Sequence, residues 1–557
     1  MSALSGVGVG RGIAAAKVLK MPEPLAPPSD EPLAADADSE HQRVQEALQE
    51  VAEELNARAV AAGGEAQQVL EAAALMAQDP AILDDVRSRL ADGANAERAT
   101  WDAYGAFRDM LTAMGGYMAE RATDLDDVAQ RVVARLRGVA APGVPQSDEP
   151  FILVARDLAP ADTATLDLEQ TLALITEDGG PTSHTAILAR SKSLPAVVGV
   201  VGILSAVTDG QLAIVDAKAG SVVLDPDAAS VDAARAERES RLAAASAPIT
   251  DGALADGTKV PLMANVGSGK DAPGAVELGA EGVGLFRTEF LFLGSSSAPS
   301  VEEQTKAYVE VLQAFPGKKV VVRVLDAGAD KPLSFLNDAH EENPALGLRG
   351  IRALRASEQI LRDQLTALAA AQAATDAELH VMAPMIADHD ETAYFVALGK
   401  ELGLASVGAM AEVPSIAVLA DQVLEAADFV SIGTNDLTQY TMAADRQLGS
   451  VAALQDPWHP AVLRLIKLIG DAGAAAGKPV GVCGEAAADP ALAVVLVGLG
   501  ATSLSMSASA IADVRAELRT VTMEQARARA ARALTARSAA EARQAAAEPD
   551  DDGLTAG

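Results

Sequence analysis

The chain has 557 residues, enough for several domains, and hydrophobic residues make up 49% of it, as expected of domains with sizeable cores. Its formal net charge of −34 argues against a nucleic-acid partner, because such a partner requires a basic surface. The single cysteine, Cys483, permits no intramolecular disulfide, and the sequence shows no signal peptide or long apolar run, so we expect a cytoplasmic protein without membrane insertion.

The first half of the chain predicts two interleaved domains. Residues 1–20 have the character of a short strand segment, and residues 38–140 carry apolar residues at the three- and four-residue spacing of helices. Within residues 151–225, the runs FILVARD, LALITE, PAVVGV and LAIVDA predict strands among helices. The expected parts are an α/β domain of residues 1–20 and 145–225, an inserted all-helical domain of residues 30–142, and a linker helix at residues 226–250.

One motif of the α/β domain points to chemistry. Gly179 and Gly180 are followed by Thr182, Ser183 and His184, and then by an apolar helical run for which Thr182 or Ser183 is the N-cap. His184 then lies in the first turn, where free N–H groups and the helix dipole favour an anion. An imidazole there can accept a phosphoryl group and hold it as phosphohistidine. The alternative is a histidine that only caps or packs, and the preceding glycines and hydroxyl residues weaken it.

The second half of the chain alternates strands with amphipathic helices. The strand candidates are, in order, VPLMAN, VGLF, VVVRVL, LHVMAPM, VGAMAE, FVSIGTND, PVGVCGE and TSLSM. Eight such units predict a (β/α)8 TIM barrel over residues 251–535, with its chemistry at the C-terminal ends of the strands. Residues 536–557 are Ala-rich and then acidic, which predicts a disordered tail.

Charged residues follow several of these strands. Glu412 and Asp436 are carboxylates at neighbouring strand ends, and two such groups suit Mg²⁺ bound together with a substrate phosphate. Either residue alone could be a solvated loop acid. Arg287, Arg323 and Arg446 could clamp phosphate and carboxylate oxygens, which match the fork of a guanidinium, although each alone is more often part of a surface ion pair.

Cys483 also lies at a strand end. A lone cysteine is more often an inert buried residue. At the mouth of a barrel, a thiol can instead serve as a general acid.

These motifs together resemble those of one family. The His184 motif is similar to the phosphohistidine motif of enzymes that use phosphoenolpyruvate (PEP). The blocks GVGLFRTEFLF, ENPALGLRGIR, EVPS, SIGTNDLTQY and GVCGEAAAD add a specific match, which covers nearly the whole chain. The chain resembles enzyme I of the bacterial PEP:sugar phosphotransferase system. The resemblance implies a multidomain α/β fold, in which a phosphohistidine domain with an inserted helical domain precedes a PEP-binding TIM barrel.

The resemblance also implies roles for single residues. His184 would carry the phosphoryl group, Thr163 would orient its imidazole, and Cys483 would protonate the enolate carbon. Glu412 and Asp436 would ligate Mg²⁺. The residues implied in binding PEP or lining the phosphate path are Arg287, Arg323, Lys331, Arg349, Asn435, Asp436 and Arg446. The inserted helical domain would dock the histidine-containing phosphocarrier protein HPr, and the barrel would form a homodimer.

Two other function classes remain open at this point. The same two domains also resemble those of a PEP synthase or a pyruvate, phosphate dikinase. Such an enzyme requires a large ATP-binding domain before the histidine, where this chain has only the acidic helical segment. A non-catalytic PEP sensor would keep the fold without the chemistry, and the intact set of candidate residues argues against it.

Overall fold

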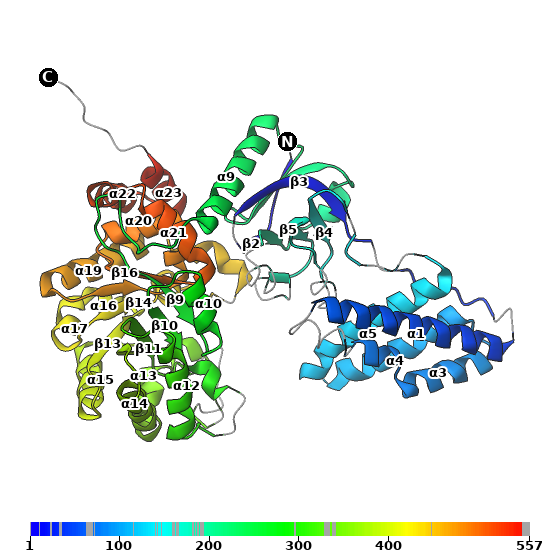
Figure 1. The fold of residues 1–557 in the computed structure, drawn as a ribbon, viewed down its shortest axis with the longest axis horizontal. Helices are drawn as coiled ribbons and strands as arrows, with labels where there is room; N and C mark the ends of the chain where they lie inside the picture. The colour runs from blue at the N-terminus through cyan, green and yellow to red at the C-terminus, as the bar shows by residue number, and fades with distance from the viewer. Residues whose placement is uncertain are drawn as a thin grey trace. The chain divides into compact units, whose positions relative to one another are not determined.

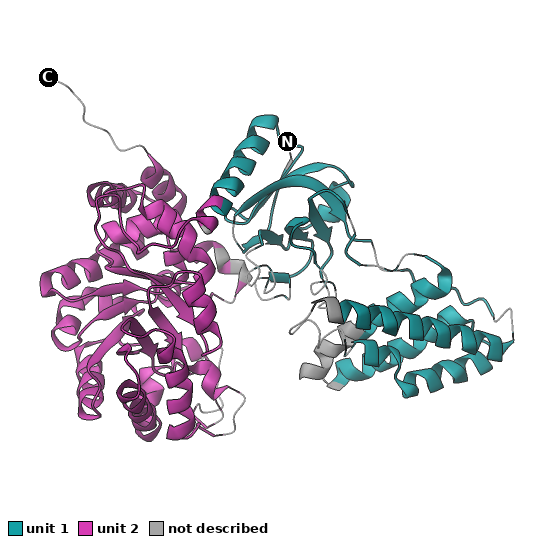
Figure 2. Cartoon of the chain, viewed as in Figure 1, with its two compact units in different colours: residues 1–242 teal, residues 243–557 magenta. Residues whose placement is uncertain are grey.

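A computed structural model describes residues 2–548 with gaps, and it falls into two compact units, residues 1–242 and 243–557 (Figure 2). The gaps are residues 11, 23–24, 33–35, 63–70, 72, 115, 140, 142, 146, 159–161, 163–165, 181–182, 184, 187–188, 190–193, 294–296, 328–332, 334, 337–340 and 447. Three predicted site residues, Thr163, His184 and Lys331, therefore lie outside the described residues.

The first unit contains an eight-stranded mixed sheet of order β1-β8-β7-β3-β4-β5-β6-β2 (Figure 1). Strand β3 lies within the first 20 residues and pairs in parallel with β4 and antiparallel with β7, so it lies in the middle of a sheet whose other central strands follow residue 150. The predicted strand segments are present, but residues 1–20 form three strands where one segment was expected, and the sequence analysis missed β8. The strands are β1 (Ser2–Ser5), β2 (Val7–Val9), β3 (Ile13–Lys20), β4 (Phe151–Ala155), β5 (Thr171–Thr176), β6 (Ala196–Val198), β7 (Leu212–Asp216) and β8 (Ser221–Leu224).

Between β3 and β4 the chain forms helices, as the apolar spacing predicts. They are α1 (Ala37–Ala62), α3 (Pro80–Ala91), α4 (Ala96–Met114) and α5 (Gly116–Arg137). In α3, Asp79 is the N-cap and its side chain accepts from the N–H of Ala81, while Ile82, Val86 and Leu90 repeat every four residues and are buried. The short helix α8 (Ile203–Ala206) precedes β7, and the longer helix α9 (Ala228–Ser246) follows β8.

The second unit is a closed barrel of eight parallel strands whose neighbours follow chain order (Figure 1). All eight predicted strands form, which confirms the predicted fold class. Their sequences are nearly continuous apolar runs, as strands covered on both faces require. The strands are β9 (Leu262–Val266), β10 (Val283–Arg287), β11 (Lys319–Arg323), β12 (Glu378–Ala383), β13 (Ser406–Ala411), β14 (Val430–Ile432), β15 (Val480–Val482) and β16 (Ser503–Met506).

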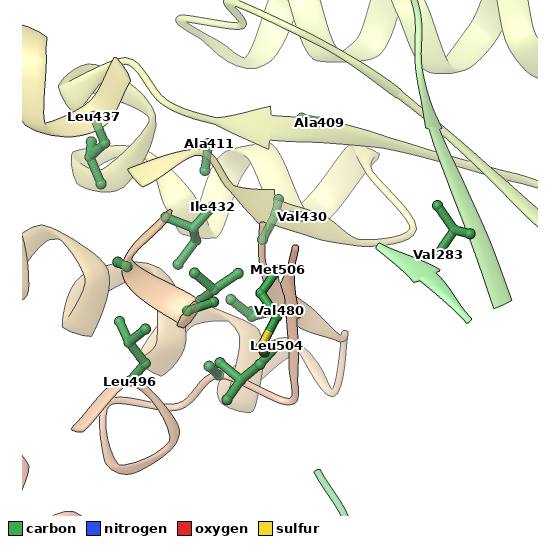
Figure 3. Close-up of a cluster of buried hydrophobic side chains, with 14 of the residues drawn as sticks. Val283, Ala409, Ala411, Val430, Ile432, Leu437, Val480, Leu496, Leu504 and Met506 are labelled. Atoms are coloured by element: carbon green, nitrogen blue, oxygen red, sulfur yellow. The ribbon is translucent and has the colours of Figure 1, made fainter. Parts of the chain in front are cut away.

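Successive residues of a barrel strand pack on opposite sides. Ala409 and Ala411 of β13 belong to the large core cluster that also holds Leu437 and Leu496 from the surrounding helices (Figure 3). Met410, between the two alanines, belongs instead to a small separate cluster. Because strand side chains alternate with a period of two, this second cluster fills the inside of the barrel. Its members are Leu285, Val321, Met382, Met410, Phe429 and Cys483.

Helices connect the strands. They are α10 (Asp271–Glu277), α11 (Glu289–Phe292), α12 (Val301–Gln313), α13 (Ile351–Ala356), α14 (Glu358–Ala373), α15 (His389–Glu401), α16 (Pro414–Val418), α17 (Ala420–Ala426), α18 (Thr434–Met442), α19 (Pro460–Ala476), α20 (Pro490–Gly498), α21 (Ile511–Leu518) and α22 (Met523–Thr535), with 3₁₀ helices η1 (Pro344–Leu346), η2 (Gly449–Leu454), η3 (Glu485–Ala488) and η4 (Ala508–Ala510).

The prediction of a disordered tail from residue 536 was wrong for its first part. Residues 539–547 form helix α23 (Ala539–Ala547), with Ser538 as the N-cap. Ala542 and Ala546, four residues apart, are buried in the core cluster of the second unit. Alanine is the strongest helix former, and its small side chain lets two helices approach closely, so an Ala-rich composition is compatible with a packed helix.

Candidate active site

The alternation inside the barrel decides which polar side chains face its mouth. Arg287 lies two residues after Leu285, Arg323 two residues after Val321, and Glu412 two residues after Met410. Each polar residue therefore continues the inward-facing row of its strand, at the C-terminal end. Because all three side chains lie on the inward side of their strands, they meet at the barrel mouth although they are far apart in the sequence. The sequence analysis had placed all three at strand ends of the barrel.

The first ion-pair group surrounds Arg323. Its Nη2 donates to Oε1 of Glu289 at 2.9 Å, and its Nη1 lies 3.2 Å from Oδ2 of Asp326. Oε1 of Glu289 also accepts from the backbone N–H of Asp326 at 3.0 Å. The three side chains are buried, and burial of a charge is tolerated only where it is paired in this way. Arg287 forms no hydrogen bond or ion pair with the residues that the structure describes, so its guanidinium is available to an anion.

Arg349 joins this group to helix α18. Its Nε and Nη2 donate to the two carboxylate oxygens of Asp326 at 3.1 and 2.9 Å, a two-bond grip that holds the guanidinium plane. Its Nη1 donates to Oδ1 of Asp436 at 2.9 Å and to the hydroxyl of Tyr440 at 3.0 Å. Burial alone would raise the pKa of Asp326, but Arg323 and Arg349 outweigh it and lower that pKa to about 2. Asp326 is therefore a permanent anion between two permanent cations.

Glu412 is held in a different electrostatic state. Its side chain is 1% exposed, and its Oε1 accepts from the backbone N–H of Met385 at 2.7 Å. Burial, followed by the neighbouring carboxylates Asp436 and Asp326, raises the pKa of Glu412 to about 8. The positive charge around Glu412 is therefore too small to stabilise its ionised form fully. Met385 has a φ of 61°, which is unfavourable for a side chain with a Cβ and is the kind of local strain found at functional sites.

Asp436 and Asn435 begin α18 and lie next to the end of β15. Oδ2 of Asp436 accepts from Nη1 of Arg446 at 3.1 Å, and Oδ1 of Asn435 accepts from the N–H of Glu485 at 3.1 Å. Gly484 permits this approach, because a Cβ there would lie 1.9 Å from Oγ1 of Thr434. The structure therefore brings the predicted residues Asn435, Asp436 and Arg446 to the same mouth.

The carboxylate oxygens of Glu412 and Asp436 are the predicted protein ligands of Mg²⁺. Both oxygens of Asp436 already accept from arginines, and Oε2 of Glu412 has no hydrogen-bond donor among the described residues. In that same part of the chain, no group of three or more His, Cys, Asp or Glu side chains could hold a metal ion. Oε2 of Glu412 is thus open to a hard cation, whereas Asp436 would exchange an arginine contact for it, and the remaining ligands would come from substrate oxygens and water.

Cys483 lies at the inner side of the site. Its side chain is 1% exposed within the cluster that fills the barrel, and its thiol donates to the carbonyl of Ile432 at 3.5 Å. Burial raises the pKa of the Cys483 thiol to about 11. The group therefore stays protonated at neutral pH, as a proton donor must.

In the first unit, the described residues around position 184 show how that turn is built. Oγ of Ser183 accepts from the N–H of Ala186 at 3.2 Å, the bond of an N-cap to the third helical residue. The buried Thr185 donates through Oγ1 to Asp157 at 2.9 Å. Ser183, one of the two N-caps that the sequence left open, therefore makes a capping bond, while Thr182 lies outside the described residues, and Asp157 ties Thr185 to the end of β4.

Sequence reasoning gave no role to some residues of the mouth. Glu289 and Tyr440 lie inside quoted motifs, GVGLFRTEFLF and SIGTNDLTQY, so their presence was visible but their contacts were not. Asp326 directly follows the predicted strand VVVRVL, and the sequence indicates no partner for it. The pairing of these residues with Arg323 and Arg349 depends on contacts across the barrel, for which a single sequence carries no signal.

Comparison with known families gives three matches along the chain. The model for the PEP-utilising enzyme, N-terminal region, matches residues 5–121, and that for the PEP-utilising enzyme, mobile domain, matches residues 147–220. The model for the PEP-utilising enzyme, PEP-binding domain, matches residues 243–523. Among the described residues, no helix has both the length and the apolar character needed to cross a membrane.

Curated relatives match almost end to end. A phosphoenolpyruvate-protein phosphotransferase of Streptomyces coelicolor is 54% identical over 549 residues, which cover 98% of each chain. Proteins of the same name from Geobacillus stearothermophilus and Bacillus subtilis are 40% and 39% identical, and the matches cover 94% of this chain and 94% and 96% of theirs. A solved structure named Enzyme I is 32% identical, covers 42% of this chain and 98% of its own, and has a TM-score of 0.39. The curated relatives and the family models confirm the resemblance to enzyme I, and the chain belongs to the phosphoenolpyruvate-protein phosphotransferase family.

Proposed function

We propose that this chain takes the phosphoryl group of PEP onto its own His184 and passes it to the histidine-containing phosphocarrier protein HPr. Family membership supports the reaction, and the mouth of the barrel supports its location. Four arginines and four carboxylates converge there, and one of the arginines, Arg287, makes no ion pair with the described residues. PEP carries a phosphate and a carboxylate, and guanidinium groups match both.

Different basic side chains would bind PEP and line the path of its phosphate. Arg287, Arg323 and Arg446 would hold the oxygens of PEP, and Asn435 would contact it beside them. Lys331 and Arg349 would line the path of the phosphate. Arg323 and Arg349 are already fixed by ion pairs to Glu289 and Asp326, so little side-chain freedom would be lost when PEP binds.

Glu412 and Asp436 would hold Mg²⁺. The ion would supply positive charge next to the phosphate oxygens, where the arginines alone leave Glu412 with a raised pKa. Thr163 would orient the imidazole of His184.

The chemical step would break the bond between phosphorus and the enol oxygen of PEP and form a bond from phosphorus to an imidazole nitrogen of His184. The electron pair of the enolate would then take a proton at the methylene carbon from the Cys483 thiol, which yields pyruvate. The thiolate would regain its proton from water before the next turnover. The raised pKa of Cys483 suits this role, because it keeps the donor protonated between turnovers.

The two halves of the reaction would use different units. His184 belongs to residues 1–242 and the PEP residues belong to residues 243–557, so the histidine must reach the barrel in one half-reaction and HPr in the other. We assign residues 1–20 and 145–225 to the phosphohistidine domain, residues 30–142 to HPr docking, residues 226–250 to the linker helix and residues 251–535 to PEP binding. A cytoplasmic location and a homodimer formed through the barrel complete the proposal, both carried over from the family.

The test is incubation of the full chain with labelled PEP and Mg²⁺ in the absence of ATP. The expected result is acid-labile label on the protein and an equal amount of pyruvate. His184→Ala should take no label but still bind PEP, and His389→Ala, at an exposed histidine of the barrel, should behave like the wild type. Pyruvate formation or labelling that requires ATP would assign the chain to the dikinase or synthase type instead. Label retained in His184→Ala would refute the acceptor.

A further inference from the structure

The C-terminal helix α23 makes contacts that the proposed reaction does not by itself require. Oδ1 and Oδ2 of Asp456 accept from the two terminal nitrogens of Arg543, at 2.8 and 2.5 Å. The guanidinium carbon of Arg543 also lies 5.6 Å from the ring centre of Trp458. A two-bond fork combined with a cation over an indole fixes the direction of the arginine more tightly than an ordinary surface ion pair does.

The helix that carries Arg543 is itself anchored. Nε and Nη2 of Arg532, on α22, donate to the carbonyls of Ala545 and Glu548, both at 2.9 Å. Helix α23 follows α22 at the C-terminal end of the chain (Figure 1). Arg543 therefore projects from a rigid support, although it lies only 14 residues from the end of a 557-residue chain.

The contacts of Arg543 lead to the segment that holds Arg446. This connection, residues 443–459, joins α18 to α19, and its described residues form no regular structure except the 3₁₀ helix η2. At its start, Gln455 donates through Nε2 to the carbonyl of Ala444 and the N–H of Arg446 donates to Gln439 at 3.0 Å. At its end, Oδ1 of Asp456 also accepts from the N–H of Trp458 at 3.1 Å. A long connection without ladder hydrogen bonds depends on such ties for its position.

The same contacts lead to the loop after Cys483. The indole Nε1 of Trp458 donates to Oδ2 of Asp489 at 2.9 Å. Asp489 is the N-cap of α20 and ends η3, which begins two residues after Cys483. Trp458 is 1% exposed, so its ring fills a defined space between the two loops.

Among the arginines of the mouth, Arg446 is the one most dependent on its loop. Its side chain is 32% exposed, against 9% for Arg323 and 4% for Arg349. Its only ion-pair partner among the described residues is Asp436. A partly exposed side chain with one partner takes its position from its backbone, and that loop is tied at Ala444 to Gln455, the residue before Asp456 in the chain.

We propose that Arg543 is a positioning residue for the PEP site. It acts through Asp456 and Trp458, and from outside the barrel it keeps two loops of that site in place. The inference rests on the proposed function, because it assigns α23 the task of placing Arg446 and the loop of Cys483. It also gives a role to a part of the chain whose sequence suggested none.

The test is steady-state kinetics of full-length variants with PEP and Mg²⁺. Loss of a partly exposed ion pair changes binding by roughly a factor of five, so Arg543→Ala should raise the KM for PEP by about three- to tenfold and change kcat less. Asp456→Ala should give a similar rise, and the double variant should be no worse than either single one, because the two residues act as a pair. Arg543→Lys should fall in between, since an ammonium cannot form the fork.

Two controls separate positioning from general damage. Arg537→Ala removes an arginine that is 89% exposed next to the same helix and should leave the KM unchanged. Exchange of phosphoryl groups between phospho-HPr and His184, which does not use the barrel, should be unchanged in Arg543→Ala. In a Trp101→Phe background, acrylamide should quench the fluorescence of Trp458 more strongly after Arg543→Ala, because the covering cation is gone.

The possible outcomes are distinct. A KM unchanged in both Arg543→Ala and Asp456→Ala would overturn the proposed role of α23 and leave the proposed function intact. Equal losses in kcat and in HPr exchange, with the KM for PEP unchanged, would also overturn it, because they would indicate a loss of folded protein. A wild-type chain that forms no pyruvate from PEP would overturn the proposed function, and the inference with it.

Discussion

The backbone N–H of Met385 donates to Oε1 of Glu412 at 2.7 Å, and this bond orients a buried carboxylate whose other oxygen has no donor among the described residues. Met385 adopts a positive φ to make it. Met385 lies two residues after the end of the adjacent strand β12, so the direction of Glu412 depends on the pairing of β12 with β13. This geometry leaves Oε2 available to a cation.

We predict that Glu412→Gln weakens the binding of Mg²⁺ in the presence of PEP by about 10- to 100-fold, because it keeps the bond to Met385 but removes a charged ligand. Isothermal titration of Mg²⁺ into protein with PEP measures the effect. Glu425→Gln, at an exposed carboxylate of α17, is the matched control. Equal affinity in Glu412→Gln and the control would exclude Glu412 as a ligand.

Cys483→Ser should slow pyruvate formation far more than it weakens PEP binding. A hydroxyl is a much poorer acid than a thiol, and loss of a general acid costs about 10²- to 10⁴-fold in rate. Rapid-quench measurement of pyruvate, with PEP affinity from titration, separates the two effects. Cys483→Ala should be no faster than the serine variant. Turnover within about twofold of the wild type in both variants would make Cys483 a packing residue.

The reactivity of Cys483 should depend on pH in a defined direction. Because its pKa in the folded chain is about 11, above the value of about 8.5 for an unfolded thiol, few thiolates exist at pH 8. Reaction with Ellman's reagent at that pH should be slower by on the order of 10²-fold in the folded than in the denatured chain. Since the chain has one cysteine, the signal is unambiguous.

The raised pKa of Cys483 also predicts how the free energy of unfolding changes with pH. A raised folded pKa means that the neutral thiol contributes stability fully below about pH 8.5, and that this contribution is lost as the pH rises towards 11. The unfolding free energy of Cys483→Ser relative to the wild type, followed by denaturant titration from pH 7 to 10, should therefore improve as the pH rises. A difference that stays constant over this range would contradict the raised pKa.

A fragment ending near residue 245 should separate the two half-reactions. It contains the first compact unit, residues 1–242, so it should exchange phosphoryl groups reversibly with phospho-HPr, because both ends of that transfer are histidines. It should take no label from PEP and Mg²⁺, because the residues of the barrel are absent. Label from PEP would place the PEP site outside the barrel, and failure to exchange with HPr would remove the helical insert as the docking site.

The sequence by itself determined the local structure and the strand-end position of the main site residues. All eight barrel strands were recognisable as apolar runs, because parallel strands covered on both faces leave that signal in the sequence. The same runs placed Arg287, Arg323 and Glu412 at the C-terminal ends of their strands, whereas their inward direction follows from the packing of Leu285, Val321 and Met410 inside the barrel. The strands and their ends depend on neighbours in the chain, so they could be predicted before any tertiary contact was known.

Only the tertiary structure decided which charges meet and with what effect. Arg349 and Asp436 are 87 residues apart and pair because the barrel closes between them. The pKa of Glu412 depends on burial and on two carboxylates from other strand ends, so no local pattern predicts it. The same reason explains the error at α23: alanines suggested disorder by composition, whereas the helix is stabilised by packing against residues distant in the sequence.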